Sequence, residues 1–189
     1  MAETYHHGDL RAALVTAALT LLDAGEGSPS LREVARAAGV SAMAPYRHFA
    51  DRAALLAAVA DQGFAALRTR LLAADDTPDS RAALVAQGRA YVDFALAHPA
   101  LFRLMFSREK TGGVPEGETA YTVLANRVAQ IAPDRAEPAT LAAWGLVHGL
   151  ATLLLDAKVG ALHRGAVEAT LELLVDGMMA RGSSKGSTG

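Results

Sequence analysis

The chain contains no cysteine, few aromatic residues and no long run of apolar residues. Without cysteine, its 189 residues can form no disulfide, no thiol nucleophile and no thiolate metal site. Aromatic residues are 5% of the total and hydrophobic residues 51%, with alanine prominent, which favours helices packed through small side chains over a β-rich fold. The length allows one or two domains with a sizeable core.

Signals for export and membrane insertion are also missing. The N-terminal sequence MAETYHHGDL lacks the apolar centre of a signal peptide. No uninterrupted apolar run approaches the roughly 20 residues of a membrane span. We therefore expect a cytoplasmic protein with no membrane partner.

Positive charge is scarce for a nucleic-acid-binding protein. The formal net charge is -2, and residues 1–52 hold five arginines against six carboxylates. Binding of DNA through bulk electrostatics is therefore not expected. If the chain binds DNA, a few well-placed groups must do so, and two copies must share the affinity.

Catalytic signatures are absent from the sequence. It has no Ser/His/Asp pattern in a strand-turn-helix setting, no phosphate-binding loop and no H-E-x-x-H motif. His6 and His7 are adjacent, so they cannot form a metal pair on one helical face. Asp75 and Asp76 lie in a linker and are expected to be solvated. We expect no enzymatic activity, no metal and no cofactor.

The stretch SLREVARAAGVSAMAPYRHF, residues 30–49, is predicted to form two short helices joined by a tight turn. Ser30 and Glu33 have the spacing of a capping box. Gly39 ends the first helix, because glycine enters the left-handed backbone region without steric strain. Ser41 suits the N-cap of the second helix. Such a helix-turn-helix places its second helix in the major groove of DNA, although a helical hairpin in an all-α core has the same local pattern.

The second helix of this unit has two unusual features. Pro45 lies inside it, and proline is tolerated only in a first turn, so the helix is expected to begin at Ser41 or Ala42. Ala42, Met43 and Ala44 offer no polar side chain to the bases. Direct reading of bases is therefore expected to be sparse, with methyl contacts and DNA shape contributing more.

The rest of the chain also has helical periodicity, interrupted at segments rich in proline, glycine or aspartate. The fold is therefore predicted to be all-α, with about nine helices. Residues 182–189 are predicted to be a disordered tail. The predicted helices cover residues 9–25, 30–38, 41–49, 51–73, 80–98, 99–107, 138–158 and 164–181, with one more between Tyr121 and Ile131.

Residues 9–56 resemble the DNA-binding domain of the TetR family of bacterial transcriptional regulators. The resemblance depends on LREVARAAGVS, on the segment ending in YRHF, and on Asp51 and Arg52 at the start of the next helix. The runs YHHGDLR, PALFRLMF and WGLVHG are similar to a TetR subgroup whose C-terminal domain is named for a Trp-His-Gly signature, here containing Trp144 and His148.

This resemblance implies a homodimer with an N-terminal DNA-binding domain, residues 1–52, and a C-terminal effector-binding and dimerisation domain, residues 74–181. The helix at 51–73 would connect them. It implies a repressor that a small molecule releases from a palindromic operator. The alternatives are an activator or co-repressor-type regulator that needs its ligand, and a helical small-molecule-binding protein without a DNA function.

Arg47 is expected to read a base, because a guanidinium can pair with guanine O6 and N7; the alternative is a phosphate contact or a solvated arginine. Tyr46 and His48 are expected to reach phosphates, a role that the resemblance gives to Tyr46. Arg52, where relatives usually have lysine, is expected on a phosphate, and the alternative is a surface charge. Phe49 is expected in the core. The predicted DNA-binding residues are Ser41, Ala42, Met43, Tyr46, Arg47, His48 and Arg52.

Trp144 and His148 are four residues apart and share one face of a helix. A histidine in an otherwise apolar helix fits a hydrogen bond to an effector, and fits equally a bond to a neighbouring helix. The predicted effector-pocket residues are Phe102, Met105, Phe106, Tyr121, Trp144 and His148.

The last two helices, residues 138–158 and 164–181, carry more apolar surface than one partner helix can cover. This surplus predicts a homodimer formed through the eighth and ninth helices. The alternative is that other helices of the same chain cover it.

Overall fold

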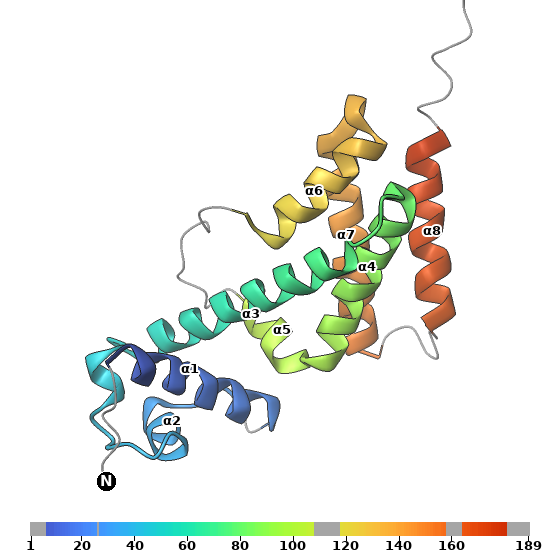
Figure 1. Cartoon of the computed structure of the whole chain (residues 1–189). Helices are drawn as coiled ribbons and strands as arrows, with labels where there is room; N and C mark the ends of the chain where they lie inside the picture. The colour runs from blue at the N-terminus through green and yellow to red at the C-terminus, as the bar shows by residue number, and fades with distance from the viewer. Residues whose placement is uncertain (1–6, 26, 108–117, 158–163, 181–189) are drawn as a thin grey trace, which may run out of the picture. The chain divides into compact units, whose positions relative to one another are not determined.

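The structure is a computed structural model that describes residues 7–25, 27–107, 118–157 and 164–180. These residues contain eight α-helices and two short 3₁₀ helices and no strand, so the predicted all-α fold is confirmed (Figure 1). The predicted tail at 182–189 and the side chains of His6 and His7 lie outside this description. The elements are α1 (His7–Asp23), α2 (Leu31–Ala37), η1 (Pro45–Arg47), α3 (Arg52–Ala74), α4 (Ser80–Ala97), α5 (Pro99–Met105), α6 (Ala120–Ile131), η2 (Pro133–Arg135), α7 (Ala136–Leu155) and α8 (Arg164–Ala180).

The chain divides into two compact units. Unit 1 comprises Met1–Phe64 and His98–Pro115, and unit 2 comprises Ala65–Ala97 and Glu116–Gly189. The first part of α3 therefore belongs to unit 1 and its last part to unit 2. The short helix α5, which the sequence places in the C-terminal domain, packs with α1 in unit 1.

Unit 1 is built around the apolar faces of α1, α2 and the first part of α3. Leu14, Val34 and Leu55 are fully buried, one from each of these helices. The ring of Phe49 is buried as predicted, and the guanidinium of Arg11 lies 5.2 Å from its centroid. This core supports the segment between α2 and α3.

The start and end of α2 have the features that the sequence predicts, and the start of α3 is also capped. The hydroxyl of Ser30 accepts from the backbone N–H of Glu33 at 3.3 Å, and the Glu33 carboxylate accepts from the N–H of Ser30 at 2.7 Å. Gly39 follows α2 with a φ of 69°, in the left-handed region that favours glycine. Asp51 accepts from the N–H of Ala54 at 2.8 Å and caps α3.

The segment predicted as the second helix of the helix-turn-helix is not α-helical. A turn at Ser41–Ala44 is followed by the 3₁₀ helix η1. Because Pro45 has no N–H, the carbonyl of Ser41 cannot receive an α-helical bond from it and accepts from Ala44 at 2.9 Å instead. The N–H groups of Arg47 and His48 also bond three residues back. The predicted capping role of Ser41 is therefore wrong, since no α-helix begins there.

Unit 2 is organised around α4, which packs against α6, α7 and α8 (Figure 1). Gly88 on α4 lies so close to α8 that an added Cβ would be 2.7 Å from Cδ2 of Leu171. Exposed ion pairs join the same helices, from Arg81 to Asp176 at 2.7 Å and from Arg89 to Glu168 at 3.3 Å. The α4–α8 contact thus combines close apolar packing with charged pairs at its margin.

The segment Pro133–Leu155, which contains α7, is the one described helix long and apolar enough to cross a membrane by length and composition, with a mean hydropathy of 1.5. A core helix of a soluble protein passes the same test. Here α7 packs against α4, α6 and α8, and 33% of the apolar window is buried. Much of its remaining apolar surface faces outward.

Candidate nucleic-acid interface and effector unit

The segment between α2 and α3 points most of its predicted DNA-binding side chains away from unit 1. Pro45 and Phe49 are buried and anchor the segment. Met43 is 69% exposed, and Arg47 and Tyr46 are also exposed, while His48 is half-buried. We call residues 41–48 the reading segment. The buried Pro45 and Phe49 hold the backbone of this segment against unit 1, and most of the other side chains are exposed.

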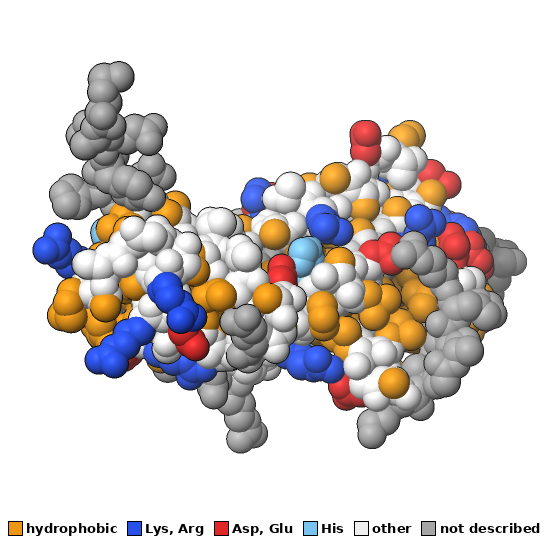
Figure 2. Space-filling view, turned by 90° about the horizontal axis from the view of Figure 1, so that it is seen from below, with side chains coloured by type: hydrophobic (Ala, Val, Ile, Leu, Met, Phe, Trp, Pro, Cys, Tyr) orange, Lys and Arg blue, Asp and Glu red, His pale blue; other side chains and the backbone are white. Residues whose placement is uncertain are grey.

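Arg47 has the properties expected of a side chain that contacts DNA. It is exposed and makes no side-chain hydrogen bond or ion pair with the described residues. The arginines of α2, Arg32 and Arg36, are likewise exposed and four residues apart, so they lie on one face. Basic side chains are visible on the surface of unit 1 in Figure 2. The first helix of a helix-turn-helix crosses the DNA backbone, so its exposed arginines are candidate phosphate contacts that the sequence reasoning missed.

Arg52 differs from these arginines because its guanidinium is already engaged. Its Nε donates to the carbonyl of Pro29 at 3.3 Å, and its Nη2 donates to the carbonyl of Ser28 at 3.0 Å. Both carbonyls belong to the loop that leads into α2. Arg52 therefore joins the first residue of α3 to the backbone just before α2.

Three of the predicted pocket residues come together in unit 2. The Trp144 ring lies edge-on to the rings of Tyr121 and Tyr91, with centroids 5.6 and 5.5 Å apart. The hydroxyl of Tyr91 lies 3.0 Å from Nδ1 of His148. Tyr91, which is not among the predicted pocket residues, joins Trp144 to His148 in this aromatic cluster. The bond also favours the interpretation that a neighbouring helix satisfies His148.

The other three predicted pocket residues lie in unit 1. Phe102 and Met105 on α5 are buried, and the ring of Phe106 is 4.9 Å from that of Phe102 and 5.4 Å from that of Phe64. A Cβ added to Gly63 would be 2.7 Å from Sδ of Met105, so α5 packs closely on α3. Within unit 1 these side chains are part of the apolar packing, and their role in binding an effector stays a prediction.

Burial lowers the pKa of His148 and raises the pKa of Tyr91 well above its usual range. The folded chain therefore holds His148 neutral at a pH where the unfolded chain begins to protonate it. Its contribution to stability is complete above the ordinary histidine pKa and is lost as the pH falls through the lowered one.

We expect a substitution of His148 by glutamine, which does not ionise, to reduce the loss of stability on acidification. The measurement is the difference in melting temperature between about pH 7.5 and pH 5, compared with the wild type. An unchanged difference in the variant would contradict the assignment. Because every other histidine is retained, their contributions cancel in this comparison.

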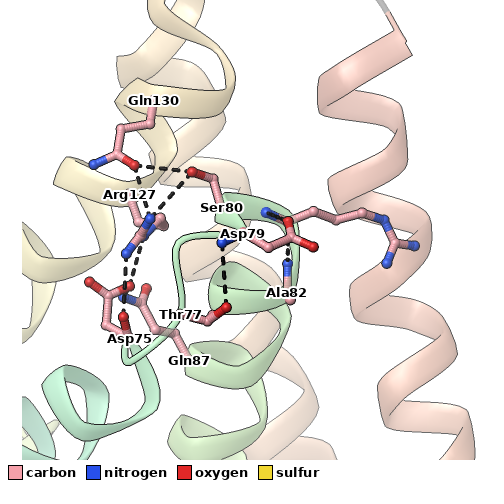
Figure 3. Close-up of polar contacts among 9 residues, drawn as sticks. Asp75, Thr77, Asp79, Ser80, Ala82, Gln87, Arg127 and Gln130 are labelled. Atoms are coloured by element: carbon pink, nitrogen blue, oxygen red, sulfur yellow. Dashed lines mark hydrogen bonds and ion pairs between the residues drawn. The ribbon is translucent and has the colours of Figure 1, made fainter.

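Asp75 is not the solvated linker residue that the sequence predicts. Its Oδ1 accepts from Nε of Arg127 at 2.7 Å and from Nε2 of Gln87 at 2.8 Å (Figure 3). The Arg127 guanidinium also donates to Gln130 at 2.9 Å and to Ser80 at 3.3 Å. This network joins the turn after α3 to α4 and α6. The bond to Asp75 raises the pKa of Arg127 and keeps its charge in place.

Gln87 is 1% exposed, and its Oε1 has no hydrogen-bond partner among the described residues. Its amide nitrogen is held by Asp75. A buried acceptor without a donor is destabilising by about 1–3 kcal/mol. The Gln87 side chain therefore has a satisfied amide nitrogen and an unsatisfied amide oxygen, and the oxygen makes its burial unfavourable.

No group of three or more histidine, aspartate or glutamate side chains that could hold a metal occurs in the described ranges.

The geometry defines a helical protein in which one unit presents a helix-turn-helix variant and the other holds an aromatic and polar interior. Comparisons with known proteins agree. The profile described as "Bacterial regulatory proteins, tetR family" matches residues 14–59, and that described as "Tetracyclin repressor-like, C-terminal domain" matches residues 84–178. The chain belongs to the TetR family of DNA-binding transcriptional regulators. No curated protein matches it.

Solved structures show the same fold over nearly the whole chain. A protein of unknown function from Rhodococcus sp. RHA1 is 34% identical, with a TM-score of 0.76 over 95% of this chain and 98% of that one. A TetR regulator from Streptomyces coelicolor is 20% identical, with a TM-score of 0.70 over 90% and 97%. A TetR variant from Acinetobacter baumannii AYE in complex with minocycline is 24% identical, with a TM-score of 0.61 over 94% and 96%.

Proposed function

We propose that the protein is a homodimeric repressor whose two copies of unit 1 bind the halves of a palindromic operator. A small molecule bound in the C-terminal part releases it, and the protein acts in the cytoplasm. The observation that carries the proposal is the reading segment, in which Pro45 is buried, as is the adjoining Phe49, while Met43, Tyr46 and Arg47 face solvent. A segment with no role in recognition has no need to present these side chains together.

Within the reading segment, Arg47 supplies the strongest base contact and Tyr46 and His48 supply phosphate contacts. Ser41, Ala42 and Met43 contribute close contacts, including methyl contacts to thymine. A 3₁₀ segment is narrower than an α-helix and has fewer residues per turn. It brings only a few side chains to the base edges, so much of the specificity must come from DNA shape and from the second half-site.

The dimer forms through α7 and α8, the predicted eighth and ninth helices. Leu141 on α7 and Leu173 on α8 are 66% and 74% exposed in the single chain. Leu173 also lines a groove of about 800 Å³ between the two helices, together with Leu146, Leu174 and Met178. Exposed apolar area of this kind is typical of an interface, and a two-fold dimer pairs the same patch on both copies.

The effector acts on unit 2, where Tyr121, Trp144 and His148 offer aromatic surface and one neutral imidazole beside the Tyr91 hydroxyl. Such a site favours an uncharged molecule with a ring or an extended apolar part. An effector releases the operator only if it binds the DNA-bound state less tightly than the free state. With the opposite preference the same protein is a co-repressor-type regulator or a ligand-dependent activator.

The proposal is tested by selecting duplexes from a random pool and from the DNA upstream of the protein's own gene, followed by binding at several salt concentrations. A palindromic sequence bound by two protomers, with affinity that falls steeply with salt, is the expected result. Failure to select any sequence at low salt would favour the helical small-molecule-binding protein without a DNA function.

We expect Arg47→Ala to lower operator affinity by about 10- to 100-fold and to relax the preference at one base pair of each half-site. Arg36→Ala is the matched control, because it removes the same charge from an exposed position on α2. It should leave the base preference unchanged. Equal binding of wild type and Arg47→Ala across all single-base variants of the operator would refute the base contact.

A further inference from the structure

Arg52 occupies a position that is electrostatically unfavourable unless its charge is compensated. It is the first residue of α3, where the partial positive charge of the helix N-terminus repels a cation. The carbonyls of Ser28 and Pro29, which accept from its guanidinium at 3.0 and 3.3 Å, supply that compensation. The arginine is thus oriented toward the loop before α2.

These two carbonyls immediately precede Ser30, the N-cap of α2. The pKa of Glu33 in the same capping box is lowered mainly by the backbone and hydroxyl of Ser30, and to a smaller extent by the charges of Arg36 and Arg52. Pro29 itself is buried. The Arg52 side chain therefore holds the capped start of α2 at a fixed place beside the start of α3.

The reading segment lies in the chain between α2 and the start of α3, and it contains a turn and a 3₁₀ helix but no α-helix. Its backbone bonds are turn and 3₁₀ bonds, except for one from the N–H of Phe49 to the carbonyl of Pro45. A continuous α-helix would hold its side chains in register by itself. Here the register depends on the buried Pro45 and Phe49 and on how the flanking helices are held together.

We propose that Arg52 is a positioning residue for operator recognition, which aligns the reading segment by joining the start of α3 to the loop before α2. This inference rests on the proposed DNA-binding function and replaces the phosphate contact expected for Arg52 from its place in the sequence. Lysine at this position cannot reproduce it fully, because a single ammonium lacks the planar fork that reaches both carbonyls.

The two roles predict different binding data. A phosphate contact contributes equally to all sequences, so its loss lowers specific and non-specific affinity alike and reduces the salt slope by about 0.9 for each protomer. A positioning residue contributes only when the reading segment meets its correct bases. Its loss lowers specific affinity, while non-specific affinity and the salt slope remain.

The experiment uses the full-length protein, the duplex that the wild type selects, and a scrambled duplex of equal length. Binding is measured for the wild type, Arg52→Ala and Arg52→Lys over a range of salt concentrations. Arg36→Ala is measured beside them as the reference for the loss of a candidate phosphate contact. For Arg52→Ala we expect a loss of about tenfold on the selected duplex, as for lost hydrogen bonds to a charged group, and for Arg52→Lys a loss that is only partly smaller. We expect no more than about twofold on the scrambled duplex, and an unchanged salt slope.

A reduced salt slope with parallel losses on both duplexes, or full rescue by Arg52→Lys, would overturn the proposal in favour of a phosphate contact. A wild type that selects no duplex would instead overturn the proposed function. Circular dichroism at the binding temperature confirms that each variant is folded. If Arg52→Ala is unfolded there, Arg52→Lys decides between the two roles.

Discussion

Replacing Leu173 with arginine is expected to convert the protein from a dimer to a monomer and to lower its operator affinity by at least about 100-fold. The side chain is 74% exposed in the single chain, so the substitution leaves the folding of one protomer nearly unchanged. In the proposed dimer it places an unpaired charge inside an apolar contact between α8 helices, which is strongly unfavourable. Loss of the dimer removes the second half-site from the same complex.

Sedimentation at micromolar concentration and operator titration measure the two effects separately. Leu141→Arg should behave in the same way, since this leucine of α7 is also exposed. Leu96→Arg is the matched control, because this leucine is 44% exposed but lies on α4. A Leu173→Arg protein that remains dimeric with full operator affinity would show that the copies associate elsewhere.

The dimer proposal also explains the composition of α7. Judged by hydropathy alone, the segment Pro133–Leu155 has the length and composition of a membrane span. Its buried side chains pack within unit 2, while Leu141 and Leu153 are exposed, as is Leu173 on α8. One helix that serves both an intramolecular core and a contact between copies must be apolar on most of its circumference.

Local signals in the sequence predicted the α2 region correctly because each one acts over a few residues. The capping box at Ser30 and Glu33 and the left-handed Gly39 are both present. The prediction of a second helix at residues 41–49 was wrong for an equally local reason. Its periodicity is helical, but Pro45 removes the N–H that an α-helix needs at that point.

Contacts between residues distant in the sequence were not predictable in the same way. Nothing in the linker DDTPD indicates that Asp75 meets Arg127 and Gln87, because that meeting depends on how α4 and α6 pack. Likewise the spacing of Trp144 and His148 places them on one face, but does not show that Tyr91 on α4 bonds to that face. Periodicity shows which residues share a face of a helix, but it does not show which other helix packs against that face.

The hydrogen bonds of Arg52 show that a residue's contacts cannot always be inferred from the family that the sequence resembles. The resemblance places it where relatives usually have lysine, and a phosphate contact was expected from that position and charge. The guanidinium fork allows a second use, two bonds to backbone carbonyls, that an ammonium lacks. A similar charge at a matching position therefore does not ensure the same contact.

Asp75→Ala is expected to lower the free energy of unfolding by about 3 kcal/mol, because it leaves Nε of Arg127 and Nε2 of Gln87 without the carboxylate oxygen that both donate to. The Arg127 side chain is 11% exposed and that of Asp75 26% exposed, so water replaces the lost bonds only in part. Urea denaturation followed by the fluorescence of Trp144, the one tryptophan of the chain, reports on unit 2.

Arg127→Met should destabilise less, by about 2 kcal/mol, because the remaining Asp75 carboxylate is the more exposed partner and keeps its bond to Gln87. In the double variant neither charge is left without its partner, so its loss should be smaller than the sum of the single losses by about 1–2 kcal/mol. Arg81→Met is the control at an exposed pair, for which about 1 kcal/mol or less is expected. Strictly additive losses for Asp75→Ala and Arg127→Met would contradict a favourable interaction between these two side chains across the 2.7 Å contact.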